Sequence, residues 1–122
     1  MKTRFIDPTS ASYAQALEVA GTTRLLFISG QVPADETGAV PDSFADQARL
    51  AWRNVFSRLA AAGMRPENLV KVTIFLSDRR FRDENAAVRM EVLGDHSPAL
   101  TIIIAGIYDE AWLLEIEAVA AA

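Results

Sequence analysis

The chain has 122 residues, of which 51% are hydrophobic and 23% charged, and its net charge is −4. This balance describes one globular domain over residues 1–122 and argues against nucleic-acid binding, which needs clustered Lys and Arg. Cysteine is absent and His96 is the single histidine, which excludes disulfides and Cys-ligated zinc and disfavours a histidine metal site. Because the N-terminus has no signal pattern and no apolar run reaches 18 residues, we expect a soluble cytoplasmic protein with no membrane partner.

The first third of the chain predicts strands. Residues 15–20 and 24–29 are separated by the turn signal Gly21-Thr22-Thr23, so they predict a β-hairpin. A short strand over residues 3–6 is an open addition. The loop that follows, residues 30–41, contains several turn residues.

The middle of the chain predicts a helix, a strand and a second helix. Apolar residues recur at helical spacing from Phe44 to Leu59, after a capping Asp42 or Ser43, and Gly63 ends that helix. Residues 69–76 alternate as a strand does. Asp78 can cap a second helix that ends near Leu93. Strands over residues 100–107 and 112–119 complete the chain.

The order is therefore strand, strand, helix, strand, helix, strand, strand. Two helices can cover only one face of such a sheet. Residues 101–105 are nonetheless apolar on both faces, and strands of that kind are buried on both sides. We therefore expect an oligomer whose subunits cover the second face. The alternative is a partly exposed apolar face that invites aggregation.

A few polar residues lie where chemistry is plausible. Ser29 and Gly30 end a predicted strand, and they can offer a hydroxyl and a close backbone approach, although a plain turn glycine explains them as well. Glu115 and Glu117 share one half-apolar face of the last strand. A carboxylate there suits general acid–base catalysis, and a solvated edge-strand carboxylate is the equal alternative.

Other candidates are weaker by themselves. Asn85 lies inside a predicted helix, where asparagine has poor propensity, so its amide is expected to hydrogen-bond a nearby segment. Tyr13 can place a phenol over a pocket or serve as a packing anchor. His96 lies in a loop without the Ser and Asp pattern of a catalytic triad, and we expect it to be exposed.

Taken in order, these residues carry a family resemblance that runs from about Tyr13 to Ala120. The matching segments are Tyr13-Ala14-Gln15-Ala16, Ile28-Ser29-Gly30-Gln31-Val32-Pro33, Thr37-Gly38, Val40-Pro41, Gln47-Ala48 with Asn54, Ala62-Gly63, residues 70–76, Phe81 with Asn85, Ser97-Pro98-Ala99 and residues 114–120. No single segment is specific, but their order and spacing are. The chain resembles the Rid (YjgF) family of reactive intermediate deaminases.

The resemblance implies a chorismate-mutase-like α+β fold, with a mixed six-stranded sheet, two helices on one face and a homotrimer whose sheets form an inner barrel. It also implies small-molecule pockets between subunits, in which imines and enamines such as 2-aminoacrylate are hydrolysed without a metal or organic cofactor. By position, the pocket residues would be Tyr13, Ser29, Gly30, Asn85 and, as the group that activates water, Glu115.

The chain departs from the family at one position. Deaminating members carry an arginine after the Pro-Ala pair, where it grips the substrate carboxylate, and this chain has Leu100. Loss of this contact would weaken the binding free energy of the substrate by about 2–5 kcal/mol. Ile102 also makes the pocket mouth more apolar. We therefore expect a divergent hydrolase with weak or no activity on 2-aminoacrylate.

Three alternatives follow from Leu100. The substrate could be less polar, with Glu115 still directing water. Arg89, one turn past Asn85 on the second helix, could replace the missing arginine, although helix arginines usually face water. Catalysis could also be lost, which would leave a regulatory or small-molecule-binding trimer.

Overall fold

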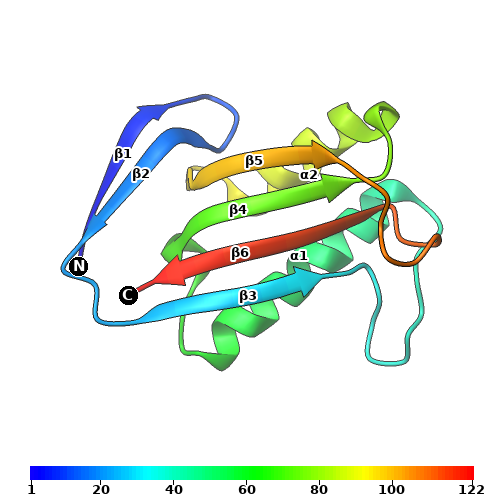
Figure 1. Cartoon of the computed structure of the whole chain (residues 1–122), viewed down its shortest axis with the longest axis horizontal. Coiled ribbons are helices and arrows are strands. Elements are labelled where there is room, and N and C mark those ends of the chain that lie inside the picture. The colour runs from blue at the N-terminus through cyan, green and yellow to red at the C-terminus, as the bar shows by residue number, and fades with distance from the viewer.

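The computed structural model describes all 122 residues as one six-stranded sheet with two helices on one face (Figure 1). The predicted order of elements is confirmed, with the N-terminal strand included. The elements are β1 (Lys2–Pro8), β2 (Ala14–Ala20), β3 (Leu25–Gln31), α1 (Phe44–Ala61), β4 (Leu69–Leu76), α2 (Arg82–Leu93), β5 (Ala99–Ile104) and β6 (Leu114–Ala121). Short 3₁₀ turns, η1 (Pro66–Asn68) and η2 (Arg79–Phe81), precede β4 and α2. Neither helix combines the length and apolarity needed to cross a membrane.

The predicted hairpin of β2 with β3 is wrong. The strand order is β1-β2-β5-β4-β6-β3, which places β2 and β3 on opposite sides of the central strands (Figure 1). The backbone N–H groups of Thr23 and Arg24 donate to the Ala122 carbonyl instead, so the chain enters the ladder of β6 after the turn. A turn signal shows where a strand ends, whereas its pairing partner is decided by the rest of the sheet.

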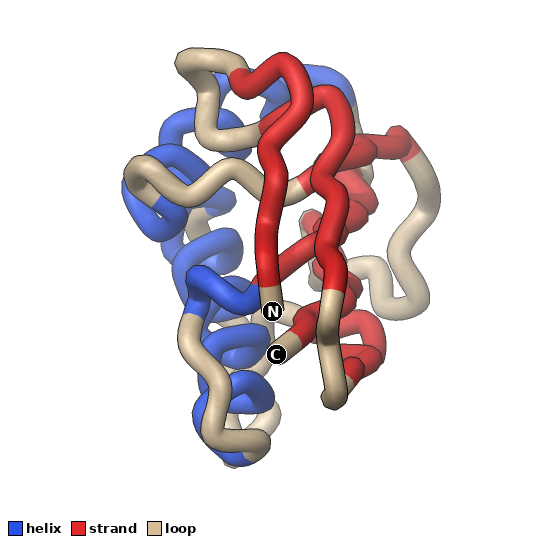
Figure 2. The backbone as a smooth tube through the Cα atoms, turned by 90° about the vertical axis from the view of Figure 1, so that its left-hand side faces the viewer, coloured by secondary structure: helices blue, strands red, loops and turns tan.

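The sheet is mixed, as expected. β5 runs parallel to β2 and β4, and the other neighbouring pairs are antiparallel. β2 pairs with β5 at one position only, Ala14 with Ala99. The hairpin of β1 and β2 therefore leans away from the rest of the sheet, as Figures 1 and 2 show, and most of the outer edge of β5 lies open.

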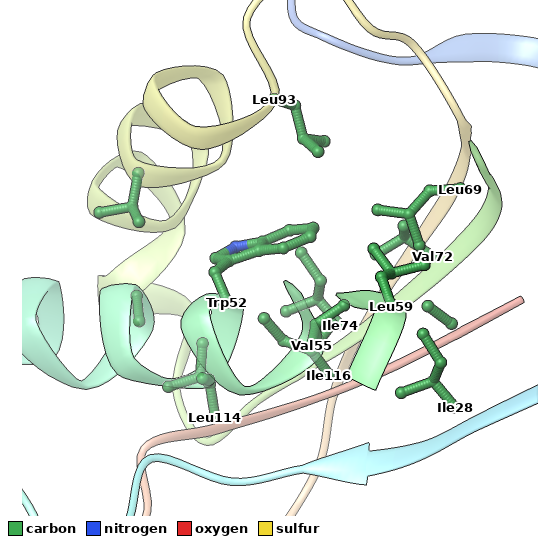
Figure 3. Close-up of a cluster of buried hydrophobic side chains, with 14 of the residues drawn as sticks. Ile28, Trp52, Val55, Leu59, Leu69, Val72, Ile74, Leu93, Leu114 and Ile116 are labelled. Atoms are coloured by element: carbon green, nitrogen blue, oxygen red, sulfur yellow. The ribbon is translucent and has the colours of Figure 1, made fainter. Parts of the chain in front are cut away.

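The hydrophobic core lies between the helices and one face of the sheet. Ser43 caps α1 by accepting a hydrogen bond from the Asp46 N–H at 3.2 Å, and Gly63 follows the helix with a φ of +70°. Trp52 is fully buried and points from α1 toward β4 and Leu93 of α2 (Figure 3). Burial of each such large side chain contributes roughly 1.5–3 kcal/mol.

The second helix is fixed to the first and to the preceding strand. Asp78 accepts a hydrogen bond from the Arg80 N–H at 2.8 Å, which caps the 3₁₀ turn η2 before α2. On the surface, Arg49 of α1 lies 2.9 Å from Glu91 of α2. His96, expected to be exposed, is half-buried, and its Nε2 lies 2.8 Å from the Leu69 carbonyl oxygen.

The face of the sheet away from the helices carries exposed apolar side chains in this single chain. Phe27 is 73% exposed, Leu25 55% and Ile103 45%. Ile102 and Ile104 of β5 are also about 40% exposed, so β5 has apolar groups on both of its faces. These exposed groups are the reason to expect an oligomer, which stays a prediction.

Candidate functional site

The first cluster of candidate residues lies where β3 meets β6, and we call Ser29, Gly30 and Glu115 the carboxylate cluster. The register between these strands shifts between Ile28 and Gln31, so the irregularity falls on Ser29 and Gly30. A Cβ at position 30 would overlap the Glu115 carboxylate. Only glycine allows that approach, so the carboxylate lies directly against the β3 backbone.

Glu115 lies on the open face of the sheet. Its register partner on β4 is Phe75, which shares that face. Glu115 is half-buried, whereas Glu117, two residues further along the same face, is exposed and pairs with Thr73. Of the two glutamates, Glu115 therefore has the more apolar surroundings and the contact with Gly30.

The second cluster surrounds a cavity of about 550 Å³ between α2 and β5, which we call the arginine pocket. Its lining residues are Leu76, Arg79, Arg82, Asn85, Ala86, Arg89, Ile102 and Ile104. Three of the eight are arginines and none is acidic, in a chain with a net charge of −4. The cavity therefore combines positive charge with apolar walls from β4 and β5.

Two polar side chains in the arginine pocket are deeply buried. Asn85 is 1% exposed, and neither its Oδ1 nor its Nδ2 has a hydrogen-bond partner in the protein, so the expected hydrogen bond to a nearby segment is not formed. Arg89 is 4% exposed; its Nη2 donates to the Ala11 carbonyl at 3.1 Å, while its Nε and Nη1 have no protein partner. Leaving a buried polar group unpaired costs about 1–3 kcal/mol, so both side chains have hydrogen-bonding capacity that the single chain leaves unused.

The expectation that Arg89 faces water is therefore wrong. Its guanidinium carbon lies 6.0 Å from the centre of the Tyr13 ring, within cation–π range. Burial lowers the pKa of Arg89 from its usual value, and the neighbouring Tyr13 partly offsets that shift. The segment before β2, which contains Tyr13, thus closes one end of the α2 face and keeps Arg89 away from solvent.

Leu100 and Ile102, which replace polar groups of the family pattern, have different surroundings. Ile102 lines the arginine pocket, as expected for an apolar mouth. Leu100 is not among the lining residues; it pairs with Val72 and packs against the hydrophobic core. The position where deaminating relatives carry arginine is thus filled here by a packing residue.

The structure divides the predicted site residues between two places. Ser29, Gly30 and Glu115 lie together by the open face, and Tyr13, Asn85 and Arg89 lie together on the helix side. Nothing in a single chain joins the two clusters. No group of three or more His, Asp or Glu side chains lies close enough to hold a metal ion.

Sequence reasoning missed Arg79 and Arg82 as pocket residues. A signal was present, because both precede or begin a helix. The N-terminal end of a helix carries a partial positive charge and favours acidic residues. Arg79 and Arg82 are unfavourable there, whereas Asp83 and Glu84 in the same turn suit the helix dipole, so the signal for an anion site at this end is weak in the sequence alone.

The chain is similar to known proteins along nearly its whole length. The family model described as endoribonuclease L-PSP matches residues 6–122. The mitochondrial protein mmf2 of Schizosaccharomyces pombe is 38% identical over 115 residues, which are 89% of this chain and 86% of that protein. TdcF of Escherichia coli, named as a reactive intermediate deaminase, is 36% identical over 67 residues, which cover about half of each protein.

Solved structures agree with this assignment. TdcF of Escherichia coli with bound serine has a TM-score of 0.77 at 28% identity, and the match covers 96% of this chain and 93% of that chain. The Rid-family protein YyfB of Yersinia pestis has a TM-score of 0.86 over the full length of both chains, and at 22% identity it supports the fold alone. The chain therefore belongs to the Rid (YjgF) family, which the endoribonuclease L-PSP model describes.

Proposed function

We propose that this protein hydrolyses a small imine or enamine to a carbonyl compound and ammonia. An enamine is first protonated on carbon and becomes the iminium ion, the protonated form of the imine. Water then adds to the imine carbon and forms a carbinolamine, whose C–N bond breaks to give the carbonyl and ammonia. The deaminase name of TdcF and the serine bound to that protein support a small amino-acid-derived substrate.

The observation that carries the proposal is the approach of Glu115 to Gly30. A carboxylate that lies against a strand irregularity, in half-apolar surroundings, can take a proton from the attacking water and return it to the leaving amine. In this proposal, Ser29 and the backbone beside Gly30, at the register shift of β3, orient the substrate near that carboxylate.

The arginine pocket supplies the second half of the proposed site. Arg89 takes the role of the arginine missing at position 100, because its buried guanidinium needs an anionic partner. A cavity with three arginines disfavours the alternative of an uncharged substrate. Asn85 adds an amide that can both donate to and accept from the substrate.

The two halves lie on opposite sides of the sheet, so we propose that a second copy completes each site. In a homotrimer whose open sheet faces pack inward, the two halves would meet at the subunit boundary, where the β3–β6 end that carries Glu115 in one copy lies beside the open edge of β5 and the arginine pocket of its neighbour. The exposed Phe27 and Ile103 support this packing, since a stable monomer rarely exposes such an apolar face. The cytoplasmic location stays a prediction; one relative, mmf2, is named as mitochondrial.

Two other functions compete with hydrolysis. A binding trimer without catalysis would keep the arginine pocket and make Glu115 dispensable. RNA cleavage, which the family description names, fits less well, because the basic groups here line a cavity on an acidic chain rather than a surface stripe.

A coupled assay tests the proposal. An amino-acid oxidase generates imines from a panel of amino acids, and imine loss is followed with and without the protein. Glu115→Gln should lower the acceleration by about 10²–10⁴-fold, the usual contribution of a general acid–base group. Glu117→Gln, two residues away on the same face, is the matched control and should leave the rate unchanged.

Two outcomes would contradict the proposal. Equal rates for the wild type and Glu115→Gln would remove Glu115 from the mechanism. No acceleration on any imine, with ligand binding and fold intact, would favour the binding trimer.

A further inference from the structure

The arginine pocket holds more positive charge than one carboxylate requires. Arg89 is at its buried end, and Arg79 and Arg82, both exposed, line the same cavity. The chain's ion pairs join Arg4 with Glu18, Arg49 with Asp46 and Glu91, and Arg65 with Glu67, so none of the pocket arginines is neutralised in this way.

The position of Arg79 and Arg82 adds to this excess of charge. Arg79 begins the 3₁₀ turn η2 and Arg82 begins α2. The first turn of α2 also contains Asp83 and Glu84, but neither of these carboxylates lines the cavity. A second anionic group at this end of the cavity would be favoured by the two arginines that line it. The cavity, at about 550 Å³, has room for a ligand that reaches from this end to Arg89.

We propose that the substrate carries two carboxylates, one bound by Arg89 and Asn85 and the other by Arg79 and Arg82. The class this describes is the imine or enamine of an acidic amino acid, with Ile102 and Ile104 packed against its carbon chain. This inference rests on the proposed function for the reaction, but the charge preference of the pocket does not depend on turnover. It also explains why 2-aminoacrylate, with one carboxylate, would be a poor substrate.

Direct binding tests the inference without any catalysis. Calorimetric titrations at constant ionic strength compare glutarate with butyrate, and methyl phosphate serves as a different anion. Glutarate should bind at least about tenfold more tightly than butyrate, since hydrogen bonds to charged groups are worth about 1.5–3 kcal/mol. The Arg79→Ala/Arg82→Ala double variant should remove that preference.

Arg80→Ala is the matched control. Arg80 lies between the two pocket arginines in sequence, but its guanidinium stacks over the Phe81 ring at 4.8 Å and it does not line the cavity. This variant should keep the preference for glutarate. Arg89→Met should weaken the binding of both ligands. Because Arg89 is buried, circular dichroism is used to check that this variant is folded. The double variant changes two exposed residues, so misfolding is a smaller concern there.

Three results would overturn the inference. The first is equal affinity for glutarate and butyrate. The second is a preference for glutarate that survives in the double variant, or that is lost to the same extent in Arg80→Ala. The third is tighter binding of methyl phosphate than of glutarate. None of them depends on imine hydrolysis, so failure of this inference is separate from failure of the proposed function. Conversely, a flat imine assay with a clear glutarate preference would reject the hydrolase and keep the dicarboxylate site.

Discussion

The two faces of the sheet show how differently one chain treats its apolar surface. On the helix side, Ile74 of β4 is fully buried under α1 and α2. On the open side, Ile103 of the neighbouring strand β5 remains 45% exposed. The chain closes one face with its own core and leaves apolar side chains exposed on the other, and each face carries half of the candidate site.

The same contrast applies to the polar residues. Asn85 and Arg89 are buried without enough partners, whereas Glu115 is half-buried beside the open face. The buried guanidinium of Arg89 and the carboxylate of Glu115 beside the open face are complementary in charge. This complementarity is the reason to join them across an interface rather than to treat each as an isolated feature.

The largest expected difference between the faces is in folding stability. Ile74→Ala should lower the free energy of unfolding by about 2–5 kcal/mol, because it leaves a cavity in a closed core. Ile103→Ala removes the same atoms from the open face, so its cost should depend on protein concentration through assembly. Chemical denaturation at several protein concentrations measures both. A concentration-independent cost at Ile103 would contradict the comparison.

The next prediction concerns assembly itself. Phe27→Glu places a charge in the exposed apolar face and should shift the mass in light scattering from about 40 kDa, three copies of the 13.3 kDa chain, to that of a monomer. Ala60→Glu, an exposed position on α1, is the control and should keep the larger mass. A wild type of 13.3 kDa at micromolar concentration would reject the oligomer.

A smaller change tests the contact between Gly30 and Glu115. Gly30→Ala introduces a Cβ where the carboxylate lies, so Glu115 must move. A displacement of about 1 Å can cost about 10²-fold in rate. Gly106→Ala is the matched control, because a Cβ there meets no atom within 4 Å. Unchanged imine turnover in Gly30→Ala would separate this contact from function.

The smallest expected effect is at the surface of the helix layer. Arg49 lowers the pKa of Glu91 through a hydrogen bond and its charge. Glu91 therefore contributes stability above the unfolded pKa of 4.5, and that contribution is lost as the pH falls through the lower folded value. The difference in thermal midpoint between the wild type and Glu91→Gln should shrink toward acid pH. A difference that grows toward acid pH would contradict this sign.

The sequence predicted the fold well because its helices and central strands have clear periodicity. The hairpin of β2 with β3 failed because Gly21 identifies a turn but not the partner of the next strand, which is β6. Register across the sheet is a tertiary property.

The site was predicted in part. The landmarks Tyr13, Asn85 and Glu115 came from the family resemblance, and their local surroundings came only from the structure. Arg89 was expected in water because arginine usually lies there, yet Tyr13 and the Ala11 carbonyl hold it inside. Whether a helix arginine turns inward depends on segments distant in sequence, which periodicity does not report.

The most direct test of the central claim, that each site joins two copies, is a complementation experiment. The Glu115→Gln and Arg89→Met chains should each have low imine hydrolase activity alone. They are co-expressed with different tags, and the mixed oligomers are purified through both tags. In a second experiment, the Arg79→Ala/Arg82→Ala chain replaces Arg89→Met as the partner of Glu115→Gln. Recovery to about a third of wild-type activity is predicted with Arg89→Met, because every mixed cyclic trimer unites both intact halves at one of its three interfaces. Mixed oligomers no more active than either variant alone would contradict the shared site.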